Sequence, residues 1–319
     1  MKTKTKIIKK GSGIDIIPDI HGQLTKLEAL LTKLGYRKEV GGGWSHPERK
    51  VLFLGDYIDR GPQIRETLHL VRGMVEAGNA TALMGNHEFN AVAYHTNDDE
   101  GSPLRLHTAK NTHQHQATLD DFSGREAELG DFLEWFKGLP MFLELEGFRA
   151  VHACWSEKHV EFLEGKSLHD REFLIKATTS KGSPEYEAIE TVLKGPEVIL
   201  PNGMQHIAPD GNGRSEMRVR WWGLDGEEKS IAYLAMPPGS LTAQDIIPKE
   251  NLANTPNHSA IEKPVFFGHY WLPPEHPKAP LAPGICCLDF SAGKDGPLVA
   301  YRWDGNRILV EENFVEGNR

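Results

Sequence analysis

Five short apolar runs recur along the chain, and each ends in a loop rich in glycine or polar residues. The runs comprise residues 14–17, 51–54, 81–84, 148–151 and 265–267. Apolar runs of this length, bounded by turn-forming residues, are typical of buried β-strands. The pattern therefore predicts five strands inside the protein.

Stretches with a helical period follow the first three runs. Leucines recur on one face between residues 24 and 34, and apolar residues do so again between residues 64 and 75. Strand, loop and helix in repeated order predict an α/β sheet. Ligands of such sheets bind at the carboxyl ends of the strands, because the loops there vary while the scaffold stays rigid. We therefore expect the functional residues in the five loops.

These loops read "PDIHG", "GDYIDRGP", "GNHE", "HACW" and "GHYW". Their candidate metal ligands are carboxylates, one amide and imidazoles: Asp19, His21, Asp56, Asn86, His152 and His269. A set without thiolate suits Mn, Fe or Zn better than Ca or structural Zn. Six ligands exceed what one open catalytic metal needs. A central carboxylate such as Asp56 could bridge two ions about 3.5–4 Å apart, an arrangement that serves phosphoryl transfer.

The remaining charges of the second loop fit a phosphate ester. Arg60 would bind phosphate oxygens, since a guanidinium fork matches their geometry. His87 could donate a proton to a leaving alkoxide if Asp59 held it oriented and charged. Taken singly, these groups could instead cap a helix or pair at the surface. The occurrence of five such loops at five strand ends favours the metal site.

Residues 156–262 form a long insertion between the fourth and fifth loops. Within it, "EVILPNG" and "RSEMRVRWWG" flank "PDGNG", whose Asp-Gly and Asn-Gly steps favour a tight turn. The pattern predicts a β-hairpin. Strand alternation would place Arg218 and Arg220 on one face, which is either solvated or turned toward a substrate.

Two further groups of residues leave alternatives open. Four histidines in the polar stretch of residues 95–135 could form a third metal site or lie in a polar loop, facing solvent or the rim of a substrate site: His95, His107, His113 and His115. Five tryptophans could stack a nucleobase or pack in the core: Trp44, Trp155, Trp221, Trp222 and Trp271.

Charge and composition narrow the class of protein. The chain has 319 residues, a formal net charge of −9 and a pI near 5.9, which argue against a general nucleic-acid or anionic-membrane surface. Its three cysteines include one adjacent pair, and they form no disulfide framework. The basic N-terminus lacks an apolar stretch behind it, and no run is long enough to span a bilayer. We expect a cytoplasmic protein that binds no membrane.

The five motifs, in this order, resemble those of the calcineurin-like metallophosphoesterases, in the branch of serine/threonine phosphoprotein phosphatases and bacterial diadenosine tetraphosphatases. The family order is GDxHG, GDxxDRG, GNHE, an HxG-type and a GH-type motif, and the likeness runs from Ile14 to about Arg302. The resemblance implies an α/β fold, a four-layer αββα sandwich with a dinuclear metal site at the C-terminal strand ends. We expect one domain over residues 1–319, with an insertion at about 156–262 that shapes specificity.

The resemblance also implies roles for the loop residues. One metal would be held by Asp19, His21 and Asp56, and the other by Asp56, Asn86, His152 and His269. The two divalent ions would be Mn, with Fe or Zn as alternatives. A metal-bridging hydroxide would attack phosphorus in line, with His87 as general acid paired to Asp59, and Arg60 would bind the phosphate.

Departures from the family pattern bear on the substrate. Protein phosphatases carry a second phosphate-binding arginine after a Trp-containing strand, and "RWWGLDGEEKS" is similar to that strand, but no arginine follows it before the fifth motif. Arg218 or Arg220 could substitute for that arginine. Asp289 matches an aspartate near the site of the bacterial dinucleotide hydrolases, which implies an accessory role in substrate binding.

The leading hypothesis is a metal-dependent phosphoesterase acting on a small phosphorylated molecule, a nucleotide or a dinucleoside polyphosphate. The alternative is a serine/threonine or tyrosine phosphoprotein phosphatase. A third hypothesis, a non-catalytic phosphate-sensing module, would require loss of a ligand or of the acid, and the sequence retains both.

Overall fold

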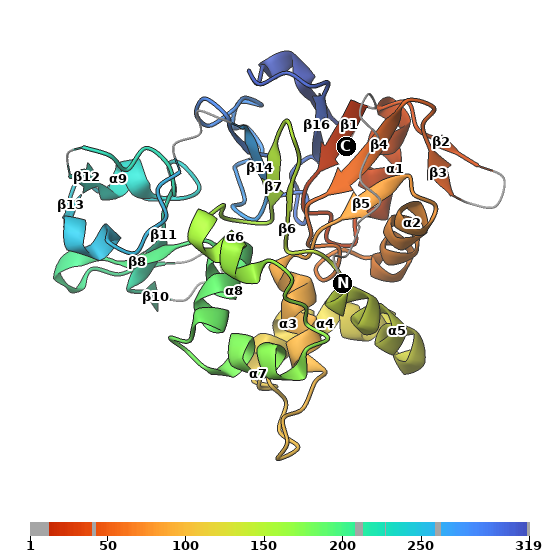
Figure 1. The fold of residues 1–319 in the computed structure, drawn as a ribbon, viewed down its shortest axis with the longest axis horizontal. Coiled ribbons are helices and arrows are strands. Elements are labelled where there is room, and N and C mark those ends of the chain that lie inside the picture. The colour runs from red at the N-terminus through yellow and green to blue at the C-terminus, as the bar shows by residue number, and fades with distance from the viewer. Residues whose placement is uncertain (1–12, 40–42, 208–212, 227, 259–262, 318–319) are drawn as a thin grey trace.

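Two β-sheets lie face to face at the centre of the molecule, in a computed structural model that describes residues 13–39, 43–207, 213–226, 228–258 and 263–317 (Figure 1). The first sheet has the order β17 (Phe314–Glu316), β16 (Val299–Trp303), β1 (Gly13–Ile17), β4 (Arg49–Phe53) and β5 (Ala80–Ala82). The second has the order β15 (Ile285–Cys287), β14 (Val265–Phe267), β7 (Arg149–Val151) and β6 (Phe142–Glu144). All five predicted strands are present, and each precedes its motif loop.

The parallel pairing explains why these loops meet. In the first sheet β1, β4 and β5 are parallel neighbours, with Ile17 beside Phe53 and Phe53 beside Ala82. In the second sheet β14 is parallel to both β7 and β15. Parallel strands point their carboxyl ends to the same edge, so the loops that follow β1, β4 and β5 leave from one edge of one sheet, and those that follow β7 and β14 leave from one edge of the other.

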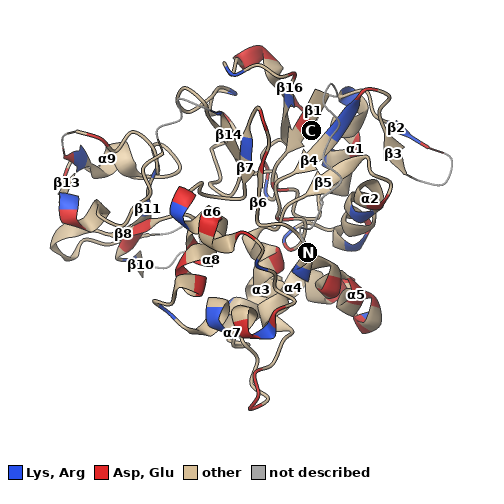
Figure 2. Ribbon diagram, viewed as in Figure 1, with Lys and Arg blue, Asp and Glu red and all other residues tan. Residues whose placement is uncertain are grey.

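Helices cover the outer faces of both sheets. The predicted helices after the first two loops are α1 (Leu24–Lys33) and α2 (Ile64–Glu76), whose buried faces include Leu27 and Leu68. On the other side lie α6 (Glu157–Leu163), α7 (Arg171–Thr179) and α8 (Pro184–Lys194), and α6 and α7 each contain both acidic and basic residues (Figure 2). Helix, sheet, sheet and helix give the four-layer arrangement that the resemblance implied.

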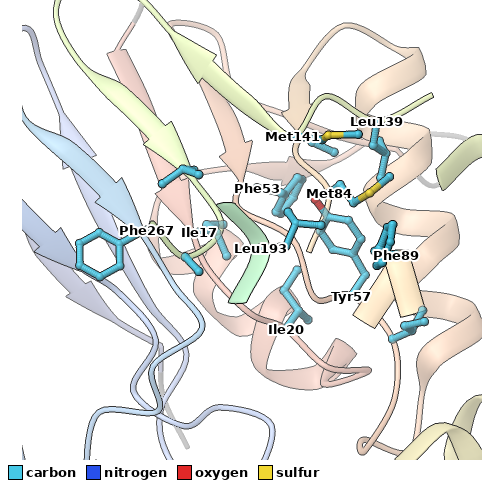
Figure 3. Packing of buried hydrophobic residues seen from close by; sticks show 14 of the residues in the cluster. Ile17, Ile20, Phe53, Tyr57, Met84, Phe89, Leu139, Met141, Leu193 and Phe267 are labelled. Atoms are coloured by element: carbon cyan, nitrogen blue, oxygen red, sulfur yellow. The ribbon is translucent and has the colours of Figure 1, made fainter. Parts of the chain in front are cut away.

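The side chains of β1 alternate between the two faces of its sheet. Ile14 and Ile16 pack between the sheets against residues such as Phe148 and Phe266. Ile17 belongs to the larger cluster that includes Phe53 and the apolar faces of the helices (Figure 3). Burying one such side chain stabilises the fold by roughly 1.5–3 kcal/mol. Both faces of the strand are therefore apolar, as expected for a parallel strand buried in a sandwich.

The prediction of a polar loop over part of residues 95–135 was wrong. After α3 (Asn86–Tyr94), this stretch forms α4 (Ala109–Asp121) and α5 (Glu126–Lys137). The side chain of Thr108 caps α4 by accepting the N–H of Asn111. Apolar periodicity could not reveal α4, because its buried residues are His115 and Thr118.

The second half of the insertion has a small core of its own, built around Val198, Met217 and Leu234. The predicted hairpin pairs β8 (Glu197–Ile199) with β11 (Glu216–Arg218) and β9 (His206–Ile207) with β10 (Gly213–Arg214), while residues 209–212 of its predicted tight turn lie outside the described residues. The remaining elements are β2 (Arg37–Lys38), β3 (Trp44–Ser45), η1 (Pro201–Gly203), β12 (Lys229–Ser230), α9 (Ile231–Leu234), β13 (Ile246–Ile247), η2 (Lys249–Leu252) and η3 (Glu311–Asn313). None of the helices formed by the described residues has the length and apolarity that crossing a membrane requires.

Candidate metal centre

The motif loops adopt backbone conformations that side chains other than glycine rarely take. Six of the eight described non-glycine residues with positive φ lie in three of these loops, and they are His21, Asp56, Asp59, Arg60, His269 and Trp271. Each such residue costs roughly 1–3 kcal/mol, and it persists only where the surrounding structure fixes it. The fold therefore holds the loops in an unfavourable shape, in which His21, Asp56 and His269 are buried.

Glycines allow the loops to approach one another. Gly55 has a φ of +108°, and a Cβ there would lie 2.5 Å from the backbone nitrogen of Gly85. At Gly268, a Cβ would run into the carboxylate of Asp19. These two close approaches bring the second loop against the third, and the fifth against the first.

Glu88 fastens the second and third loops together. Its Oε2 accepts the backbone N–H groups of Asp56 at 2.9 Å and Gly85 at 3.0 Å, and its Oε1 accepts that of Tyr57 at 2.8 Å. Burial raises the pKa of Glu88 to about 7. This role of Glu88 was not predicted from the sequence, although its place in the "GNHE" motif was an available signal.

The six predicted ligands converge, and each is at most 8% exposed. The Oδ2 atom of Asp56 lies 3.4 Å from Nε2 of His152 and 3.6 Å from Nε2 of His21. The Oδ1 atom of Asn86 lies 3.0 Å from Nε2 of His152 and 2.7 Å from Nδ1 of His269.

Asp19 completes the cluster, and its two oxygens both accept the backbone N–H of His269 at 3.1 Å. Two groups have potential ligand atoms within 4.8 Å of one another, one made of His21, Asp56 and His87 and the other of Asp56, His152 and His269. Asp56 is common to both, which is the position a bridging ligand would take.

The donor atoms fit divalent cations. His21 uses Nδ1 to bond the carbonyl of Ile58 at 2.8 Å, and His152 uses Nδ1 to bond that of Leu54 at 2.9 Å. Such bonds leave Nε2 with its lone pair directed into the cluster. The Nε2 atom of His21 is buried without a hydrogen-bond partner, and a metal ion beside Asp56 would satisfy it. The Nδ1 atom of His269 lies next to Oδ1 of Asn86, so these two atoms can face one ion together.

The buried carboxylates of the cluster favour positive charge among them. Burial and the neighbouring Asp289 carboxylate raise the pKa of Asp19 well above its usual value. Burial opposes protonation of His152, but Asp56 and then Asp19 outweigh it and raise the pKa of His152 to about 10. Carboxylates crowded in a buried site favour a proton or a metal cation among them.

A second constellation surrounds His87. Its Nδ1 lies 2.5 Å from Oδ2 of Asp59, as the sequence analysis predicted. Burial lowers the pKa of His87, but Asp56 and then Asp59 outweigh it, and the pKa ends above 6.5. Arg60 stands 3.5 Å from Nε2 of His87 with its guanidinium 4.0 Å above the ring of Trp271. An imidazole paired with a carboxylate and a cationic fork thus stand side by side.

Sequence reasoning missed the groups that hold Asp59. Its Oδ1 accepts hydrogen bonds from Nδ1 of His115 at 2.8 Å and from the hydroxyl of Thr118 at 2.5 Å. His115 in turn meets His95 at 3.1 Å between their Nε2 atoms. The placement of His115 and Thr118 three residues apart in the sequence was the available signal, because that spacing puts both on one face of a helix.

A cleft of about 1420 Å³ opens over these residues, and Arg60, Asn86, His87 and Trp271 line it. Eight lysines and arginines and five aspartates and glutamates form its walls, although the whole chain has a net charge of −9. Positive charge therefore gathers in the cleft, as expected for an anionic ligand.

The three residues predicted to assist substrate binding differ in position. Arg218 lines the cleft. Arg220 does not, because its guanidinium lies 4.3 Å from the ring centre of Tyr233 and β11 ends before it, so strand alternation no longer applies. Asp289 does not line it either, since its oxygens accept the N–H groups of Trp271 at 2.8 Å and Ser291 at 2.9 Å.

The structure decides, residue by residue, between a metal site and a polar surface for the four histidines, and between the cleft and the core for the five tryptophans. His113 is exposed, and His107 stacks on Tyr94 with ring centres 3.8 Å apart. Among the described residues, no third group suited to a metal forms around these histidines. Four tryptophans are buried in the core, namely Trp44, Trp155, Trp221 and Trp222, and Trp271 alone of the five lines the cleft.

Comparison with known proteins agrees with this geometry. Residues 13–199 match the family model of the calcineurin-like phosphoesterases. The chain is 25% identical over 300 residues to a symmetrical bis(5'-nucleosyl)-tetraphosphatase of Vibrio cholerae serotype O1, which covers 93% of this chain and 97% of that protein. It is 31% identical over 131 residues to the asymmetrical bis(5'-nucleosyl)-tetraphosphatase PrpE of Bacillus subtilis (strain 168), covering 40% of this chain and 51% of that protein.

Among solved structures, a protein serine/threonine phosphatase from Saccharomyces cerevisiae aligns with a TM-score of 0.48 and 14% identity, over 97% of this chain and 79% of that one. The family model spans more than half of the chain and includes four of the five motif loops. The chain belongs to the calcineurin-like phosphoesterases and is a hydrolase that acts on phosphate esters.

Proposed function

We propose that the protein hydrolyses a dinucleoside polyphosphate or a related small phosphorylated molecule in the cytoplasm, with two Mn²⁺ ions. The observation that carries the metal site is the convergence of two groups of buried ligand atoms on Asp56, with the Nε2 atom of His21 left without a hydrogen-bond partner. One ion would be held by Asp19, His21 and Asp56. The other would be held by Asp56, Asn86, His152 and His269. When bound, such ions neutralise charge on the phosphate and act as Lewis acids.

The side chains around the metal site bind the phosphate and donate the proton to the leaving group. Arg60 binds phosphate oxygens, and its stacking on Trp271 fixes the plane of the guanidinium. His87 donates a proton to the leaving oxygen. Asp59 keeps the imidazole oriented and favours its protonated form, because the carboxylate lies 2.5 Å from Nδ1.

The walls of the cleft support a polyanionic substrate of low molecular mass. They carry more basic than acidic side chains in an acidic protein, and Trp271 offers an aromatic surface beside the phosphate-binding Arg60. Two relatives named as tetraphosphatases lend weight to the dinucleotide. The insertion at about 156–262 would shape specificity, since Lys158, Glu190 and Arg218 from it line the cleft. Three buried free thiols fit a reducing compartment.

Metal-dependent hydrolysis by the purified protein tests the proposal. The metal-stripped protein should be inactive, and Mn²⁺ should restore turnover of diadenosine tetraphosphate above that of p-nitrophenyl phosphate and phosphopeptides. Asp56→Asn should abolish the restored activity, by roughly a thousandfold or more, because one substitution weakens both metal sites. Faster turnover of phosphopeptides would favour the phosphoprotein phosphatase instead. Metal binding without any turnover would favour a phosphate-sensing module.

A further inference from the structure

Arg105 is a partly buried cation in the wall of the cleft, in the segment between α3 and α4. One amino group donates to Oδ1 of Asn90 at 3.3 Å, and the other donates to Oε1 of Gln114 at 2.9 Å. Its backbone N–H is fixed by the carbonyl of Ala93 at 3.0 Å. The guanidinium is therefore held in place by neutral groups.

No described carboxylate forms an ion pair with Arg105. The two acids that act on its charge from farther away are Glu190 and Asp59. Glu190 is paired with Lys194, and Asp59 is occupied by His87, His115 and Thr118. Partial burial of a cation without a carboxylate partner costs free energy. An anion that enters the cleft would offset this cost.

The position of Arg105 indicates which part of a substrate it would meet. Arg105 and His87 line the same large cleft, and both also line a small cavity of about 10 Å³ beside it. Asn90, which fixes Arg105, lies one helical turn after His87 on α3. Because the general acid faces the leaving group, a cation next to it faces the leaving group as well. Lys110, at the start of α4, extends the same wall.

We propose that Arg105, supported by Lys110, forms a second anion subsite that holds the phosphate of the leaving group. The inference rests on the proposed phosphoesterase activity and refines its substrate class to compounds with at least two linked phosphates. In hydrolysis the oxygen of water gives up a proton to solvent and bonds to phosphorus, and the bond from phosphorus to the bridging oxygen breaks. The bridging oxygen keeps that electron pair and takes the proton of His87, while Arg105 binds the other charged oxygens of the leaving phosphate.

Replacement of Arg105 tests the subsite in the Mn²⁺-loaded enzyme. In Arg105→Met, kcat/KM for diadenosine tetraphosphate should fall roughly 10- to 100-fold, the range expected for a lost hydrogen-bonded charge. Hydrolysis of p-nitrophenyl phosphate, whose leaving group carries no phosphate, should change less than about threefold. Arg105→Lys should lie between the wild type and Arg105→Met, since an ammonium keeps the charge but not the fork. Arg171→Met removes an arginine that pairs with Asp99 outside the cleft, and it should leave both activities and their ratio unchanged.

Inhibition supplies a second measurement that does not need a dinucleotide substrate. Inhibition is measured with p-nitrophenyl phosphate as substrate. Arg105→Met should raise the inhibition constant of tripolyphosphate by about the same factor by which it lowers kcat/KM for diadenosine tetraphosphate. It should leave the inhibition constant of orthophosphate unchanged. An equal loss on both substrates, or an unchanged ratio of the two inhibition constants, would overturn the subsite. If the wild type fails to hydrolyse diadenosine tetraphosphate, the proposed substrate falls, and the inhibition ratio alone decides on the subsite.

Discussion

The motif loops and the walls of the cleft are built in contrasting ways. In the loops, the proposed ligands and His87 are at most 9% exposed, and backbone bonds to Glu88 hold two of the loops together. In the walls, charged side chains such as Lys110 and Lys158 are exposed on helices. The contrast fits the proposed function, in which the loops would perform the chemistry and the walls would select the substrate.

Helix α4 belongs to both regions. Its inner face presents His115 and Thr118 to Asp59, whereas Lys110, Asn111 and Gln114 line the cleft. Substitutions on the two faces should therefore have different effects, one on the rate with every substrate and the other on substrate preference.

After loss of the bridging Asp56, the next largest effect is expected at the proton donor proposed in the third loop. His87→Ala removes the proposed proton donor and should lower kcat for alkyl phosphate esters by roughly 10²- to 10⁴-fold. Binding of Mn²⁺, measured by isothermal titration calorimetry, should persist, because none of the six proposed ligands changes. The loss should be smaller for p-nitrophenyl phosphate, whose leaving group needs less protonation. A variant that retains full kcat on an alkyl ester would remove His87 from the mechanism.

The loops were predictable from the sequence for a physical reason. A ligand such as Asp56 must follow a buried strand, and both the strand and the charged loop leave short-range patterns in the chain. Five strands and the convergence of six ligands could therefore be predicted. The partners of Asp59 could not, since His115 reaches it across 56 positions of sequence. The direction in which Arg220 points was equally hidden, because it depends on where β11 ends and on the ring of Tyr233.

An intermediate effect is expected on the inner face of α4. His115→Ala removes one of the hydrogen bonds that hold Asp59, so we expect kcat to fall roughly 3- to 10-fold with every substrate. Burial lowers the pKa of His87, while Asp56 and the well-oriented Asp59 raise it above 6.5. When Asp59 is held less firmly, it raises the pKa of His87 less. His87 then loses its proton at lower pH, and the alkaline limb of kcat should shift to lower pH.

Two matched variants sharpen this test. His113→Ala changes an exposed histidine on the same helix and should leave both kcat and the pH profile as in the wild type. His115→Gln keeps a side-chain N–H donor and should recover part of the rate. A loss of activity in His115→Ala without a shift of the alkaline limb would mean that His115 serves only the packing of α4.

The smallest effect is expected in the outer wall. Arg218 lines the cleft and lies 3.6 Å from Glu197, a partly exposed pair of the kind that contributes about 0–1 kcal/mol to stability. Arg218→Met should lower kcat/KM for diadenosine tetraphosphate about two- to fivefold and should leave p-nitrophenyl phosphate and the melting temperature unchanged. Arg220 lies two positions after Arg218 but packs on Tyr233. Arg220→Met should therefore not alter either activity. If Arg218→Met instead matched the loss expected for Arg105→Met, the cleft would have two equivalent anion subsites, and the preference for a leaving-group phosphate would no longer follow from Arg105 alone.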